Sequence, residues 1–150
     1  MPPLKSFLSA LFGASNRLSD LEKLILTSVG LKINKQLRPL WDGQIQAINK
    51  IQRLPEGVEV NFYRMKGGRP IFDAKLAFPN KTEELQIARV EIKLANAPQK
   101  LVAQVWCIKG FLFSIEYQGG INYFEEAAGL DTPSELQIAC ELTADLADPN

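Results

Sequence analysis

Apolar and polar residues alternate along much of the second half of the chain, a period typical of β-strands. Residues 101–108 are apolar on both faces, which predicts a strand covered on both sides. Lys109-Gly110 then predicts a two-residue hairpin turn. Residues 111–117 predict a second strand, whose buried face would hold Phe111, Phe113, Ile115 and Tyr117. We expect these strands to form the central hairpin, with Trp106 and Phe113 as core residues.

Three stretches before this hairpin show the same alternation. They are residues 58–63, 72–78 and 88–94, and each is followed by a turn signal at 66–69, 79–81 or 96–98. Five strands linked by short connections predict an antiparallel meander. Charged residues on the polar faces of these strands are expected to pair across strands.

The first predicted helix follows Ser19. Ser19 and Glu22 have the spacing of a capping box, in which each side chain bonds the backbone of the other residue. Apolar residues then recur at helical spacing at Leu21, Leu24, Ile25, Val29, Ile33 and Leu37. Gly30 weakens the helix by about 1 kcal/mol relative to alanine. Pro39 is expected to end or kink it, because proline disfavours helical geometry at the residue before it.

Two stretches fit both a helix and a strand. In residues 40–54, Trp41 and the isoleucines suit a helix face, whereas Gly43 permits a strand that continues through the turn at 55–57. We favour a helix, or a helix that passes into a strand. In residues 134–143, the preceding Thr132-Pro133 is typical of a helix start. Strict alternation favours a sixth strand instead.

The pattern as a whole predicts one α+β domain: an N-terminal helix, or two, packed on a five- or six-stranded antiparallel meander sheet. Its 150 residues suit a single domain. We expect residues 1–18 to be a leader or a short docking helix, 19–146 to form the domain and 147–150 to be a mobile tail. No apolar run is long enough to predict a membrane span.

Composition narrows the chemistry. The chain contains no histidine, which excludes Ser-His-Asp and Cys-His catalysis and histidine-ligated zinc. Its two cysteines, Cys107 and Cys140, lie in apolar patterns and are expected to be free thiols in the cytoplasm. Gly67-Gly68 and Gly119-Gly120 lack phosphate-loop spacing and are typical of turns. We therefore assign no catalytic, cofactor-binding or metal-binding residues and do not expect an enzyme.

Charge is unevenly distributed although the net charge is zero. Residues 1–100 hold sixteen basic and nine acidic residues, and residues 101–150 hold one basic and eight acidic residues. The two parts either neutralise each other on packing, or the acidic part recruits a basic partner. Candidate partner-binding residues are Glu125, Glu126 and Asp131. Because the basic residues are scattered, we expect no nucleic-acid binding.

Two classes of function fit these observations. The first is a non-enzymatic module that binds another protein, or a second copy as a dimer, as an adaptor, chaperone-like or inhibitor/immunity-type protein does. The alternative is a small-ligand-binding or enzymatic domain with a cavity between the helix and a curved sheet. Tyr63, Arg89 and Glu116 are the candidate pocket residues for that alternative.

Overall fold

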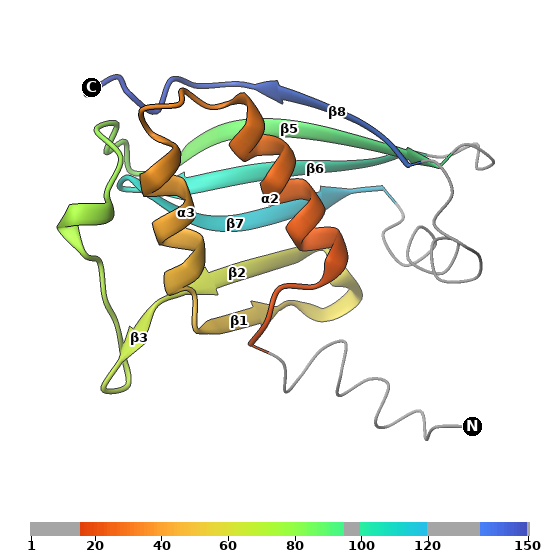
Figure 1. Cartoon of the computed structure of the whole chain (residues 1–150). Coiled ribbons are helices and arrows are strands. Elements are labelled where there is room, and N and C mark those ends of the chain that lie inside the picture. Colours follow the sequence, from red (N-terminus) through yellow and green to blue (C-terminus); the bar gives the residue numbers. More distant parts are fainter. Residues whose placement is uncertain (1–15, 95–99, 120–135, 150) are drawn as a thin grey trace.

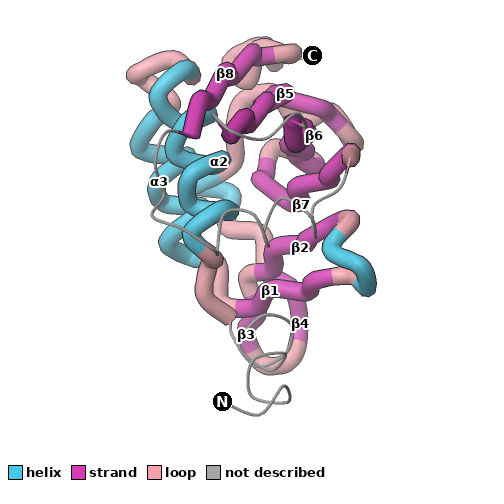
Figure 2. The backbone as a smooth tube through the Cα atoms, turned by 90° about the vertical axis from the view of Figure 1, so that its right-hand side faces the viewer, coloured by secondary structure: helices cyan, strands magenta, loops and turns pink. Residues whose placement is uncertain are grey.

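Two α-helices lie on one face of a six-stranded antiparallel sheet in the computed structural model, which describes residues 16–94, 100–119 and 136–149 (Figures 1 and 2). This arrangement confirms the predicted α+β layout. Neither helix is long and apolar enough to cross a bilayer. Residues 1–15 of the predicted leader, the turn at 96–98 and the helix-start signal at 132–133 lie outside the described residues.

The sheet has the strand order β1-β2-β7-β6-β5-β8. Its strands are β1 (Lys50–Arg53), β2 (Glu59–Tyr63), β5 (Leu85–Leu94), β6 (Lys100–Ile108), β7 (Phe111–Gln118) and β8 (Leu136–Leu142). The order is that of a meander within β5–β7, but β2 pairs with β7 and β8 pairs with β5. A separate small hairpin joins β3 (Met65–Lys66) to β4 (Arg69–Pro70). The sixth strand predicted within 134–143 is therefore confirmed.

The first helix, α2 (Asp20–Lys32), has the predicted capping box but ends earlier than predicted. Glu22 N donates to Ser19 Oγ at 3.1 Å, and Ser19 N donates to Glu22 Oε1 at 2.8 Å. Extended backbone at Ile33 ends the helix. The second helix, α3 (Arg38–Ala47), has Pro39 in its first turn. The prediction that Pro39 ends a helix was wrong, because a first-turn residue needs no N–H bond and proline is favoured there.

The stretch 40–54 is a helix that passes into a strand. After α3, the chain forms β1 and then the short 3-10 helix η2 (Pro55–Gly57), which leads into β2. Glu22 and Arg53 join the start of α2 to β1 with an ion pair of 2.9 Å.

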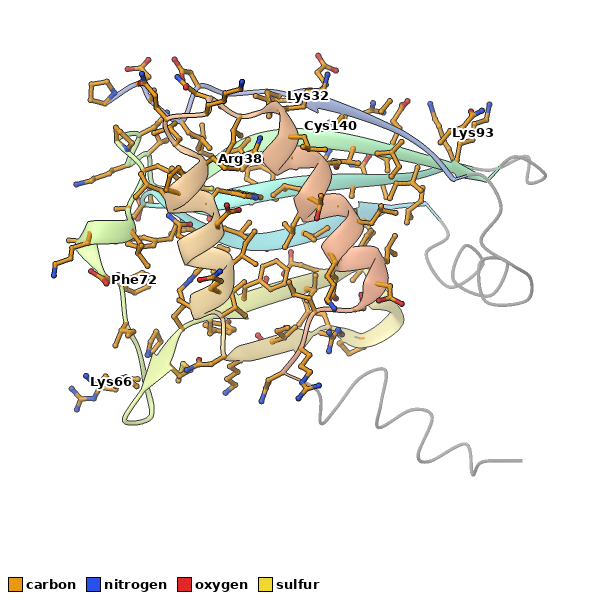
Figure 3. All side chains as sticks on the ribbon, viewed as in Figure 1. Lys32, Arg38, Lys66, Phe72, Lys93 and Cys140 are labelled. Atoms are coloured by element: carbon orange, nitrogen blue, oxygen red, sulfur yellow. The ribbon has the colours of Figure 1, made fainter. Side chains whose placement is uncertain are left out.

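The strand predicted over residues 72–78 is absent from the structure. This segment instead contains the 3-10 helix η3 (Ala74–Leu76), and Asp73 Oδ1 accepts a hydrogen bond from Lys75 N at 3.0 Å. Phe72 is 61% exposed, and its ring lies 5.3 Å from that of Phe111. Figure 3 shows Phe72 on the connection outside the sheet. Local Asp73 capping and prolines on both sides outweigh the alternating pattern.

A β-bulge changes the faces of the central hairpin. Trp106 is opposite Ser114, but Cys107 is opposite Leu112, so Phe113 is an extra residue in β7. Leu112 therefore shares the helix-covered face with Ile115. The prediction that Phe113 is a core residue on this face was wrong, because alternation holds only within a regular ladder. Trp106 and Phe113 are both only half-buried, so β6 is not fully covered on both sides.

The turn of this hairpin is as predicted. Lys109 and Gly110 have φ values of 52° and 91°, the positive values that a two-residue turn requires. A Cβ atom on Gly110 would lie 3.0 Å from the carbonyl oxygen of Phe78, which crosses the turn at this point. Phe78 N also donates to Gly110 O at 2.9 Å.

The hydrophobic core lies between the helices and the sheet. Among its largest fully buried side chains are Trp41, Phe62, Phe78, Ile25, Leu26, Ile87, Ile92, Leu101, Leu112 and Ile115. Trp41 Nε1 donates to Leu26 O at 3.2 Å, which ties α3 to α2. A Cβ atom on Gly30 would lie only 2.9 Å from Trp41 Nε1. Gly30 weakens α2, but because it has no Cβ atom it permits the close approach of the two helices.

Two buried polar side chains join the second helix to the sheet. Gln44 Nε2 donates to Leu76 O at 2.6 Å and to Gly110 O at 2.9 Å, and its Oε1 accepts from Leu112 N at 2.7 Å. Arg64 donates to Gln44 O at 3.1 Å and to Leu112 O at 2.8 Å. Burial lowers the pKa of Arg64 to about 10. These contacts hold α3 to the start of β7.

Both cysteines are free thiols, and their reactivities should differ. Burial raises the pKa of Cys107 to about 12 and also raises that of Cys140, which is half-buried on β8 beside α2 (Figure 3). The thiolate is the nucleophile, and access limits its reaction. We expect iodoacetamide at neutral pH to label Cys140 slowly and Cys107 hardly at all in the folded protein. Peptide mass mapping checks this; equal labelling of the two without denaturant would contradict the fold around β6.

Candidate functional site

The helices cover one face of the sheet and leave the other open (Figure 2). A hollow of about 390 Å³ lies on this open face. It is lined by Glu59, Asn61, Glu84, Trp106, Cys107, Ile108, Phe113, Ser114 and Glu116. Strand pairing assigns it to this face, because Asn61 and Trp106 are both opposite Ser114, whereas the next rung, Val60 with Ile115, is buried in the core. The volume is within the range of small binding sites.

Two glutamates face each other across neighbouring strands at this hollow. Glu59 on β2 is the direct partner of Glu116 on β7. Like charges in directly opposite positions destabilise a sheet. Glu84 adds a third carboxylate, and the described lining residues include no lysine or arginine. Within the described part of the chain, none of the three glutamates forms an ion pair. Among the described residues that line it, the hollow therefore carries only negative charge.

Aromatic rings form the apolar part of the hollow. Trp106 and Phe113 both line it. The ring of Tyr63 meets that of Phe113 edge-on at 5.5 Å, and the Tyr63 hydroxyl donates to Gln52 Oε1 at 3.1 Å. The β7 bulge brings Phe113 to this face. Carboxylates beside half-buried aromatic rings form a suitable environment for an organic cation.

Two buried polar atoms at the hollow lack hydrogen-bond partners among the described residues. They are Asn61 Oδ1 and Trp106 Nε1. Asn61 is 7% exposed, and its Nδ2 donates to Gln52 Oε1 at 3.5 Å. Its Oδ1 accepts no hydrogen bond from the described residues. An unsatisfied buried group costs about 1–3 kcal/mol, so retaining two of them at one hollow suggests a role outside folding.

A second hollow, of about 300 Å³, lies between α2 and α3. Trp41 lines it, together with Lys23, Arg38 and Asp42, so its charged residues have both signs. Figure 3 shows Arg38 near the start of α3. This second hollow is the groove between the two packed helices. Because its described charged residues include a carboxylate beside the two cations, whereas those of the other hollow are all acidic, we take the hollow on the open sheet face as the candidate site.

The predicted pocket residues are only partly brought together. Glu116 lines the hollow, and Tyr63 contacts its Phe113. Arg89 lies on β5, pairs with Glu91 at 2.8 Å and is not a lining residue. Apolar side chains fill the space between helices and sheet where we had considered a cavity. The candidate partner-binding residues Glu125, Glu126 and Asp131 lie outside the described residues.

Sequence reasoning did not identify Glu59, Asn61 or Trp106 as site residues. Glu59 had the pattern of an ordinary solvated strand charge, and Trp106 that of a core residue. No local signal pairs Glu59 with Glu116, because that pairing depends on β2 and β7 being neighbours.

The described residues contain no cluster of three or more histidine, cysteine or acidic side chains arranged to hold a metal ion. The chain matches no protein-family model, no curated protein and no solved structure. The geometry of the hollow is therefore the main basis for a functional proposal.

Proposed function

We propose that this protein is a non-enzymatic binding module that receives a basic segment of another protein on the open face of its sheet. The opposed pair Glu59 and Glu116, which form no ion pair with any described residue, is the observation that carries the proposal. A partner's positive charge would relieve the repulsion between the two carboxylates. Adaptor, chaperone-like and inhibitor/immunity-type modules of this kind act by binding another protein and catalyse no reaction.

The aromatic residues support a protein partner. Half-buried Trp106 and Tyr63 are of the residue types that contribute most to protein interfaces. The acidic residues Glu125, Glu126 and Asp131 follow β7 in the chain, and in this proposal they add to the attraction of a basic partner.

A small organic cation in the same hollow is the second candidate. The unpartnered atoms Asn61 Oδ1 and Trp106 Nε1 favour it, because small-ligand sites combine apolar walls with a few convergent polar groups. A free ligand of this kind would bind without any partner protein.

Removing one charge of the opposed pair should stabilise the free protein. We expect Glu59→Gln or Glu116→Gln to raise the free energy of unfolding by about 0.2–1 kcal/mol, because each ends the like-charge contact. Urea denaturation at low salt measures the change. The matched control is Glu141→Gln, which removes a charge from β8 opposite Arg89 and should give no gain. A loss of stability in both β2 and β7 variants would mean that these carboxylates have stabilising partners.

The substitutions that stabilise the free protein should weaken its binding to the partner. The immobilised protein is exposed to extract from its own source at low and moderate salt, and retained proteins are identified by mass spectrometry. We expect the native protein to retain one stoichiometric partner. The Glu141→Gln variant should also retain this partner, and the double variant Glu59→Gln/Glu116→Gln should lose it. A separate triple variant with Glu125→Gln, Glu126→Gln and Asp131→Asn should retain less of this partner than the native protein does. Retention of the same partner by the Glu59/Glu116 double variant would contradict the proposal.

A further inference from the structure

We propose that the hollow on the open sheet face binds the guanidinium group of an arginine in the partner, in preference to a lysine ammonium. This inference rests on the proposed function and names the side chain that the site selects. Its basis is the combination of opposed carboxylates, aromatic walls and a buried, unpartnered amide oxygen.

The arrangement of acceptors favours a planar group with several donors. Glu59 and Glu116 are direct partners on adjacent strands and both line the hollow, so one bound group can meet two carboxylates. A guanidinium has five N–H donors in a fixed plane and can bond two carboxylates at once. An ammonium has three donors on one atom and acts as a point charge. A pair of carboxylates is therefore bridged more completely by arginine.

The walls of the hollow favour the same group. Trp106 offers an indole, the aromatic side chain that binds cations best, and Phe113 offers a second ring. A guanidinium is flat and weakly hydrated, so it stacks on an aromatic face at a smaller desolvation cost than an ammonium. The apolar walls thus add to the preference for arginine.

Asn61 and Trp106 indicate that the arginine belongs to a polypeptide. Asn61, which is more than nine-tenths buried and lines the hollow, can accept a further guanidinium N–H at Oδ1. Trp106 Nε1 is a donor, and a guanidinium has no acceptor for it. A peptide carbonyl next to the arginine would supply that acceptor. A backbone-free guanidinium compound would leave Trp106 Nε1 unpaired.

The two tryptophans provide an internal control for the test. The chain has only Trp41 and Trp106, so a ¹⁵N–¹H spectrum of the full chain contains two indole signals. Trp41 Nε1 donates to Leu26 O in the core. The labelled protein is titrated at millimolar concentrations with N-acetyl-arginine N-methylamide, and separately with the matching lysine and citrulline compounds and with methylguanidine. We expect a saturable shift of the Trp106 signal, with Trp41 unchanged.

We expect the arginine compound (blocked arginine) to bind most tightly. The matching lysine compound (blocked lysine) and methylguanidine should bind at least about tenfold more weakly, and the citrulline compound should give no saturable shift. Glu59→Gln should abolish the arginine shift, while an unchanged Trp41 signal shows that the variant is folded. Equal binding of lysine and arginine, or no Trp106 shift with blocked arginine, overturns this inference. The proposed function would still stand if partner capture depended on Glu59 and Glu116. Binding of methylguanidine as tight as that of blocked arginine would point to a free cation instead of a peptide.

Discussion

Replacing Trp41 by alanine is expected to lower the free energy of unfolding by about 3–5 kcal/mol, the usual cost of emptying a large core position. Trp41 is 1% exposed, and its ring stacks on that of Phe78 with centroids 6.3 Å apart. It also donates to Leu26 O, so the substitution removes both packing and a tie between the helices. Urea denaturation followed by circular dichroism measures the loss.

The other tryptophan is the matched control. Trp106→Ala should cost clearly less, because Trp106 is half-buried on the open face of the sheet. If Trp41→Ala does not fold, Trp41→Phe keeps a ring and should cost about 1–2 kcal/mol through the lost hydrogen bond and part of the packing. A larger loss for Trp106→Ala than for Trp41→Ala would place the core on the wrong side of the sheet.

Gln44→Leu should lower the free energy of unfolding nearly as much as Trp41→Ala, although glutamine and leucine are similar in size. Gln44 is fully buried and bonds Leu76 O, Gly110 O and Leu112 N. Leucine would leave these backbone groups without their partner at about 1–3 kcal/mol each, so we expect a loss of roughly 3 kcal/mol or more. Chemical denaturation measures the total loss. Amide hydrogen exchange at Leu112 reports the contact itself, since its N–H should exchange faster in the variant.

Gln46→Leu is the control for this position. Gln46 is exposed on the same helix, so the same chemical change there should alter stability by no more than about 0.5 kcal/mol. Equal unfolding midpoints for Gln44→Leu and the native protein would show that Gln44 does not hold α3 to the sheet.

Local signals predicted local structure well in this chain. The capping box at Ser19 and Glu22 and the turn at Lys109-Gly110 each depend on a few neighbouring residues, and both are present as predicted. Local patterns misled where a competing local preference was stronger. Asp73 caps a 3-10 helix within an alternating stretch, and Pro39, which was predicted to end or kink the first helix, lies in the first turn of the second one.

The candidate site could be predicted only in fragments. Glu116 and Tyr63 were identified, but they were grouped with Arg89, which lies on β5 and pairs with Glu91. The bulge at Phe113 had no signature in the alternating pattern, yet it moved this ring from the predicted core to the hollow. A one-residue shift exchanges the two faces of a strand, so a site on one face is sensitive to each such irregularity.

The sequence by itself determined the elements and the chemistry that is excluded: the α+β class, most strands and turns, and the absence of histidine-based catalysis. The tertiary structure alone decided that β2 lies beside β7 and therefore that Glu59 faces Glu116. Helices and turns depend on contacts between near neighbours, which a short window of sequence contains. Pairing between distant strands depends on the packing of the whole core, and the hollow exists only as its consequence.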